Sequence, residues 1–90
     1  MQYVYVRHTV EDYAKWRPGF DANEPARRAA GSTGVYHLFR DSGNPNEITV
    51  ILEWDSLDNA RRFAQDPALR EVMKEAGVMG QPEIRFLERA

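Results

Sequence analysis

The sequence of 90 residues contains no cysteine. Disulfide bonds, thiolate metal sites and a cysteine nucleophile are therefore excluded together. Long apolar runs are missing as well. The start, Met1 to Val6, is apolar but too short for a signal peptide, and no run approaches the length of a membrane span. We therefore expect a cytoplasmic protein that has no membrane partner.

An excess of one charge is also missing. Twelve basic and fourteen acidic residues are interspersed and give a net charge of −2, so no surface for nucleic acid is indicated. The one glycine-containing turn of interest, Gly31–Gly34, lacks the lysine of a phosphate-binding loop and precedes a strand. Flavin, nicotinamide and haem signatures are absent, and no His/Glu cluster has ligand spacing. The sequence thus predicts neither a cofactor nor a metal.

The composition is that of a folded globular domain, with 42% hydrophobic and 29% charged residues. We expect a single domain over residues 1–90, because a chain of this length can bury only one small core. Alternating and β-branched segments predict four strands: Tyr3–Thr9, Gly34–Arg40, Glu47–Trp54 and Ile84–Leu87. Helical periodicity fills the two long intervals, between Tyr13 and Gly31 and between Ser56 and Gly77. The order β-α-β-β-α-β predicts an α+β, ferredoxin-like fold with a four-stranded antiparallel sheet.

Several residues mark helix boundaries. Thr9 lies three residues before Asp12, which is a weak capping-box signal. Proline at Pro18 predicts a kink, because it removes a backbone donor. Asn23-Glu24-Pro25 predicts a second helix start, and Asp66-Pro67 predicts that the later helical interval is two segments rather than one.

The strand faces follow from an assumed hairpin register that pairs Arg40 with Glu47. With that register, the face beneath the helices carries Val4, Val6, His8, Val35, His37, Phe39, Ile48, Val50, Leu52, Trp54, Ile84 and Phe86. The opposite face carries Tyr3, Tyr5, Tyr36, Leu38, Ile51 and Leu87 among charged residues. An apolar patch of this kind is larger than soluble monomers usually expose. We expect a homodimer formed through this open sheet face; the alternative is a monomer with an amphipathic outer sheet.

The chain resembles the dimeric α/β-barrel superfamily, which includes antibiotic-biosynthesis monooxygenases and small polyketide cyclases. The resemblance is carried by Val6–Tyr13, Trp16, Phe20-Asp21, Glu53–Leu57, Ala60–Phe63, Leu69–Met73, Ala76–Val78 and Pro82–Ile84. It implies that two sheets pack face to face as a barrel and that each subunit keeps a pocket between its sheet and its helices. Members share the architecture and differ in chemistry, so the resemblance does not choose a reaction.

His8 and His37 are the only histidines, and both are assigned to the helix-facing side. Both are candidate catalytic residues and His8 is the better base, since a neutral imidazole in an apolar pocket can accept a proton near working pH. The alternative is a core histidine that bonds backbone atoms or Asp12. A flat aromatic ligand site is predicted from Tyr13, Trp16, Phe20, Phe39 and Trp54. Aromatic residues at helical spacing are also typical of a plain core.

These observations predict a small homodimeric pocket protein that acts on a hydrophobic aromatic or polyketide-like molecule. The expected chemistry is a cofactor-independent cyclisation or mono-oxygenation, either of which starts with loss of a proton from carbon or hydroxyl. The alternative is a non-catalytic protein that binds or stabilises such a molecule. It is favoured by the shortage of polar groups for stabilising an oxyanion, since only the two histidines and Tyr13 are available.

Overall fold

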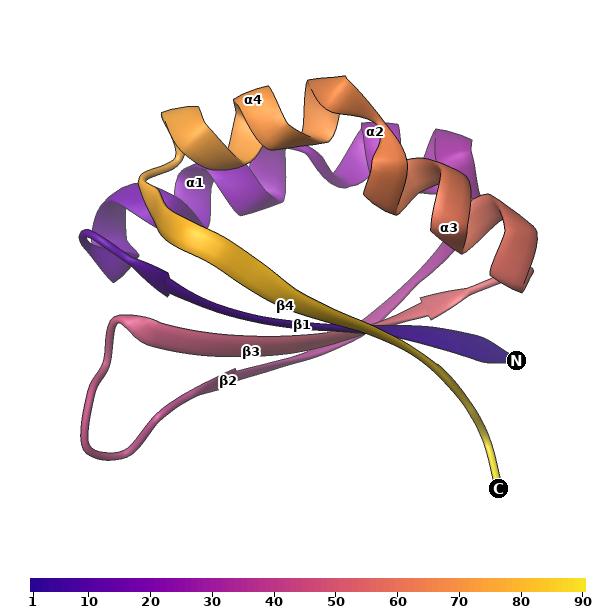
Figure 1. Ribbon diagram of the computed structural model, residues 1–90, viewed down its shortest axis with the longest axis horizontal. Coiled ribbons are helices and arrows are strands. Elements are labelled where there is room, and N and C mark those ends of the chain that lie inside the picture. The colour runs from indigo at the N-terminus through magenta and orange to yellow at the C-terminus, as the bar shows by residue number, and fades with distance from the viewer.

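A computed structural model describes residues 1–90, and its element order is β-α-β-β-α-β with each helical interval divided in two. The elements are β1 (Gln2–Val10), α1 (Tyr13–Ala22), α2 (Glu24–Ala30), β2 (Ser32–Arg40), β3 (Glu47–Trp54), α3 (Leu57–Gln65), α4 (Pro67–Glu75) and β4 (Val78–Glu88). The strands form one antiparallel sheet in the order β2-β3-β1-β4, and every helix lies on the same face of it (Figure 1). The predicted α+β ferredoxin-like fold is confirmed.

The helix boundaries follow local capping chemistry. Asp66 has an extended backbone (φ −68°, ψ 123°) and its side chain accepts the Ala68 N–H at 2.9 Å, so it ends α3 and begins α4. The predicted break there is confirmed. The capping box predicted from Thr9 is wrong: Thr9 lies within β1, and Asp12 itself caps α1 by accepting the Ala14 N–H at 3.0 Å. α1 continues through Pro18.

The predicted hairpin register is wrong by one residue. Arg40 pairs with Ile48, because the Asp41 N–H donates to the Glu47 carbonyl oxygen (2.9 Å) and the turn is one residue shorter than assumed. A shift of one residue moves every side chain of a strand to the other face. The face assignment of β2 is therefore reversed: Tyr36 and Leu38 pack beneath the helices, whereas Val35, His37 and Phe39 lie on the open face.

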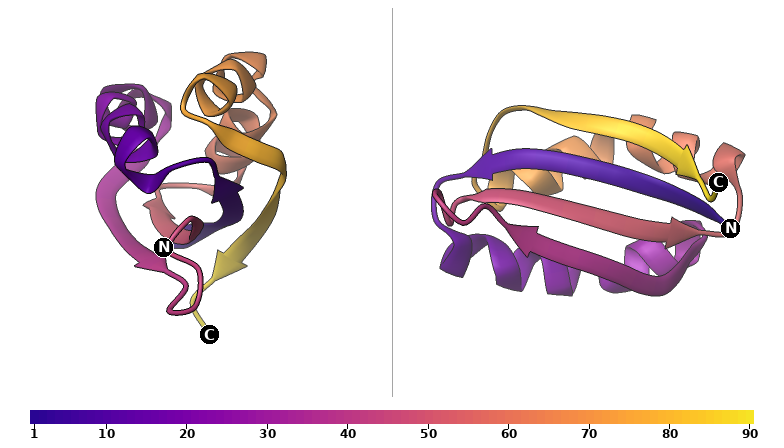
Figure 2. Two further views of the ribbon diagram at one scale, coloured as in Figure 1. Left: turned by 90° about the vertical axis from the view of Figure 1, so that its left-hand side faces the viewer. Right: turned by 90° about the horizontal axis from the view of Figure 1, so that it is seen from below.

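The face assignment of β1 is confirmed. Val4, Val6 and His8 lie opposite Leu52, Val50 and Ile48 of β3, and all six are buried beneath the helices. The helices cover them in two rows, α1 with α2 and α3 with α4 (Figure 2). This packing leaves the neighbours of His8 almost entirely apolar.

The opposite face of the sheet is uncovered (Figure 2). Phe39 is 54% exposed and Val35 47% exposed, and they share this face with Tyr3, Tyr5, Ile51 and Leu87. An apolar sheet face of this kind is typical of a surface that meets another protein. None of the helices is both long enough and apolar enough to cross a membrane.

Candidate functional site

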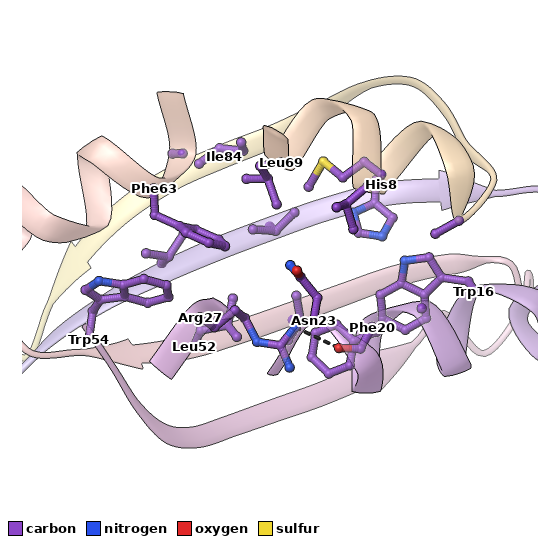
Figure 3. A pocket seen from close by; sticks show the side chains of 18 residues that line it. His8, Trp16, Phe20, Asn23, Arg27, Leu52, Trp54, Phe63, Leu69 and Ile84 are labelled. Atoms are coloured by element: carbon purple, nitrogen blue, oxygen red, sulfur yellow. Dashed lines mark hydrogen bonds between the residues drawn. The ribbon is translucent and has the colours of Figure 1, made fainter. Parts of the chain in front are cut away.

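A cavity of about 70 Å³ lies between the sheet and the helices (Figure 3). Eighteen residues line it, and fourteen of them are hydrophobic. Holding one water takes roughly 10–15 Å³ measured in the same way, so the space accommodates a few waters, whereas a cavity that binds benzene measures about 150 Å³ and an aromatic ligand would need further room. The polar side chains of the wall belong to three residues only: His8, Asn23 and Arg27. Any polar chemistry in the cavity depends on these three.

His8 reaches the cavity from the end of β1. Its ring centroid lies 5.5 Å from that of Trp16, and its side of the strand is closed by Ile48 of β3. Only 6% of His8 is exposed, and neither Nδ1 nor Nε2 has a hydrogen-bond partner. Burial lowers the pKa of His8 from 6.5 to about 4, because a charged imidazolium loses its hydration there. The ring is therefore neutral at pH 7, with one nitrogen able to accept a proton.

The aromatic wall comes from α1 and from the end of β3. Trp16 and Phe20 lie four residues apart on one helix face and stack with their centroids 4.9 Å apart. Trp54 is fully buried, packs 5.0 Å from the Phe63 ring, and donates its indole N–H to the Ala30 carbonyl oxygen. Because the indole N–H is already bonded, Trp54 offers the cavity a flat apolar surface. The structure thus brings His8, Trp16, Phe20 and Trp54 of the predicted site together.

Three residues predicted for the site do not line the cavity. His37 and Phe39 are exposed on the open sheet face, as a result of the one-residue register shift. Tyr13 lies at the start of α1, where its ring packs against the Arg40 guanidinium at 4.1 Å and its hydroxyl accepts a bond from Arg17. The expectation that both histidines face the pocket is wrong, and only His8 does.

Two residues of the wall were not predicted from the sequence. Arg27 of α2 is only 5% exposed, and Asn23 lies at the junction of α1 and α2. The EPARRAA segment contains two adjacent arginines, of which only Arg27 faces the cavity. The sequence did contain one signal for the pair Asn23 and Arg27. They are four residues apart, and this spacing places two side chains on the same face of a helix.

A second hollow of about 370 Å³ adjoins the cavity beside β4. The two spaces share four wall residues, Ala64, Leu69, Met73 and Ile84. The hollow lies where the pairing of β1 with β4 shifts abruptly, since Arg7 pairs with Glu83 but Thr9 pairs with Met79. A bulge of this kind widens a strand edge next to a site. Met73, which has a flexible side chain, lines both spaces.

No family model matches the sequence, and no curated protein matches it. Solved structures do match. One is a protein from Bordetella bronchiseptica with the provisional name antibiotic biosynthesis monooxygenase. It superposes on this chain with a TM-score of 0.80, covers 99% of this chain and 96% of its own, and is 19% identical in sequence. SnoaB, a cofactor-independent oxygenase from Streptomyces nogalater, gives a TM-score of 0.70 over 99% and 93% at 22% identity.

The chain has the fold of these two proteins. The superfamily resemblance drawn from the sequence is confirmed at the level of architecture, and the cavity lies where that resemblance places a pocket. Identities of 19% and 22% carry the fold and not the reaction. The chemistry must therefore be argued from this chain's own residues. These include no cluster of three or more His, Asp and Glu side chains that could hold a metal ion.

Proposed function

We propose that the protein binds a hydrophobic aromatic molecule in the cavity and oxygenates it without a cofactor, with His8 as the proton acceptor. One observation carries the proposal: both ring nitrogens of His8 lack partners inside an apolar cavity. An unpaired buried polar group typically lowers stability by about 1–3 kcal/mol, so a structural histidine would be expected to have at least one bond. A histidine held ready for substrate has this arrangement.

The reaction can be written for an electron-rich phenol. Neutral His8 accepts the hydroxyl proton, which leaves a phenolate whose ring carbon is electron-rich. That carbon forms a bond to O2, and loss of water from the resulting hydroperoxide leaves a carbonyl. For 1-naphthol the balance is C10H8O + O2 → C10H6O2 + H2O. The substrate itself supplies the electrons, so no other reductant is required.

The low pKa of His8 bears on this step. A base with a pKa of about 4 is weak toward a free phenol. However, the imidazolium that forms would lie beside a new oxyanion in a low-dielectric cavity, where opposite charges stabilise one another. Proton transfer in this site therefore depends on how well the oxyanion is held.

Two alternatives share the cavity. Removal of a proton next to a carbonyl would start a cyclisation with the same base. A non-catalytic binding role is favoured by the small volume and the apolar wall, which suit retention of a ring without turnover.

The open sheet face supports a homodimer as the working assembly. Phe39, Val35 and Leu87 are each at least 39% exposed there, and SnoaB and the Bordetella bronchiseptica protein have the same sheet architecture. Packing two such faces together would bury these side chains and leave each cavity on the outside of the barrel. We propose that each subunit then carries its own site.

The test is oxygen consumption with 1-naphthol as substrate. The protein should consume O2 and form 1,4-naphthoquinone, identified by mass, and His8→Gln should reduce the rate roughly 10²–10⁴-fold, the usual contribution of a general base. His37→Gln is the matched control, because His37 lies on the open face and should leave the rate unchanged. Binding of 1-naphthol without oxygen uptake would refute the oxygenase and favour the binding role.

A further inference from the structure

Arg27 is a buried cation in the cavity wall with no counter-ion. Its side chain makes one hydrogen bond, from Nη1 to the Phe20 carbonyl oxygen at 2.8 Å, and its guanidinium carbon lies 4.0 Å from the centroid of the Phe20 ring. No carboxylate oxygen lies within 4.0 Å of it. Nε and Nη2 make no hydrogen bond within the chain and keep some contact with solvent, since the only fully enclosed side-chain nitrogens without a partner are those of His8. Buried charges are normally paired, because burial removes their hydration.

The acidic residues nearest to Arg27 are engaged elsewhere. Asp21 accepts a bond from Arg17 at 3.0 Å, and Glu24 lies 3.6 Å from Arg28. Burial lowers the pKa of Arg27, and this is the largest effect. The charges of Glu24, Tyr36 and Asp21 raise the pKa. An arginine keeps its charge at neutral pH in any protein environment. The cavity therefore carries one fixed positive charge on an otherwise apolar wall.

Asn23 adds a second unpaired donor beside Arg27. Its backbone oxygen accepts the Arg27 N–H at 3.1 Å, so the two residues are one helical turn apart. Asn23 is the N-cap residue of α2, but its side chain forms no capping bond and no other hydrogen bond. Figure 3 shows its amide projecting among the cavity residues, beside Arg27 and Phe20. A carboxamide offers two N–H donors to a ligand oxygen.

We infer that the cavity selects an aromatic ligand bearing an anionic oxygen, a carboxylate or a phenolate, which Arg27 and Asn23 hold while the ring lies among the apolar side chains of the cavity wall. The forked N–H groups of a guanidinium fit such an oxyanion, and charge-assisted bonds of this kind are the strong ones. This inference rests on the proposed site and names its substrate class.

The test compares charged ligands with uncharged ligands of similar size. Isothermal titration calorimetry at pH 7.5 should show benzoate binding roughly 10- to 100-fold more tightly than benzamide, the factor expected for one charge-assisted hydrogen bond. In a second arm, 4-nitrophenol, largely ionised at this pH, is compared with 4-nitroanisole. Preference in only the first arm would assign a carboxylate ligand, and preference in only the second a phenolate. Equal binding of charged and uncharged ligands in both arms would overturn the inference.

Variants assign the preference to its residues. Arg27→Met keeps an unbranched side chain against Phe20 and should abolish the preference for the anion. Arg28→Met is the matched control, because Arg28 is the neighbouring arginine on the same helix with 58% of its side chain exposed. It should leave the preference intact, and equal losses in both variants would indicate a general surface-charge effect instead.

Asn23→Ala keeps the test valid if Arg27→Met does not fold. The Asn23 side chain bonds to nothing in the chain, so its loss should leave the melting temperature nearly unchanged and weaken benzoate binding severalfold. Unchanged benzoate affinity in a folded Asn23→Ala would overturn the assignment, and so would an anion preference retained in a folded Arg27→Met.

These measurements separate the ligand class from the reaction. They record binding only, so an anion preference that disappears in Arg27→Met stands even when no oxygen is consumed. Conversely, oxygen uptake that depends on His8 with no anion preference would leave the proposed function standing and remove this inference.

Discussion

The stability of the protein should fall steeply between pH 6.5 and pH 4 because of His8. In the unfolded chain the imidazole binds a proton with a pKa near 6.5, whereas burial lowers the folded-state pKa to about 4. Between these values the unfolded state binds more protons than the folded state. The free energy of unfolding therefore rises with pH through this window and is lost as the pH falls.

The magnitude follows from the two pKa values. One pKa unit corresponds to about 1.4 kcal/mol, so the fall from 6.5 to about 4 is worth about 3 kcal/mol. Exposure is only 6%, so solvent screening does not reduce this figure greatly. Burial is the only cause of the shift, and no neighbouring charge contributes. For a small domain, 3 kcal/mol is a large part of the total stability.

Urea unfolding at several pH values and one protein concentration measures this effect. The native protein should lose about 3 kcal/mol more than His8→Gln between pH 7 and pH 4, since the other titrating groups are common to both. His37→Gln is the control and should follow the native protein. The NMR titration of the His8 ring should give a midpoint near 4. Parallel stability curves for the native protein and His8→Gln would refute the argument that His8 is buried and neutral.

Two further predictions concern the open face and a glycine. Ile51→Glu should convert the proposed dimer to monomers, because it places an unpaired charge between Tyr5 and His37 on the open face. Sedimentation at micromolar concentration measures this change. A native protein that already sediments as a monomer would contradict the prediction. Gly31→Ala should lower the free energy of unfolding by more than about 1 kcal/mol, since its φ is 127° and a Cβ would lie 2.5 Å from Asp55 Oδ1. Gly43→Ala, in a surface turn without a positive φ, should change it by less than about 0.5 kcal/mol in the same urea titration.

The sequence predicted the fold well because its signals were local and consistent. Alternation in Tyr3–Thr9, the caps at Asn23 and Asp66, and the glycine stop at Gly31 each have a short-range physical cause. The position of His8 beneath the helices followed from the same alternation, since Val4 and Val6 precede it on one face.

The errors arose where one residue of register decided the outcome. The turn between β2 and β3 could close with Arg40 opposite Glu47 or, as observed, opposite Ile48. Composition does not separate the two, because Val35 and Phe39 are as apolar as Tyr36 and Leu38. The choice depends on tertiary packing, in which Tyr36 meets Phe20 with centroids 5.2 Å apart. His37 was misplaced for this reason alone.

Arg27 and Asn23 were missed for a different reason. A charged residue on a short helix is usually solvated, and here Arg28 follows that rule while Arg27 does not. Which of two adjacent arginines faces inward depends on how α2 rests on the sheet. The Phe20 carbonyl oxygen, which lies near the end of α1, receives the Arg27 bond only because α1 and α2 meet at Asn23.

The polar residues of the cavity make the strongest physical case that it is a site and not merely a core. His8 comes from β1, Asn23 from the helix junction and Arg27 from α2, so three separate segments each place a polar group in the same apolar space. His8 would stabilise the fold more if it were replaced by a hydrophobic residue of similar size, since a buried polar group without partners is unfavourable. In the proposed reaction, the neutral base would accept a proton and the fixed cation would stabilise the negative charge that remains. A plain core would require neither residue, whereas proton abstraction from an aromatic substrate requires both.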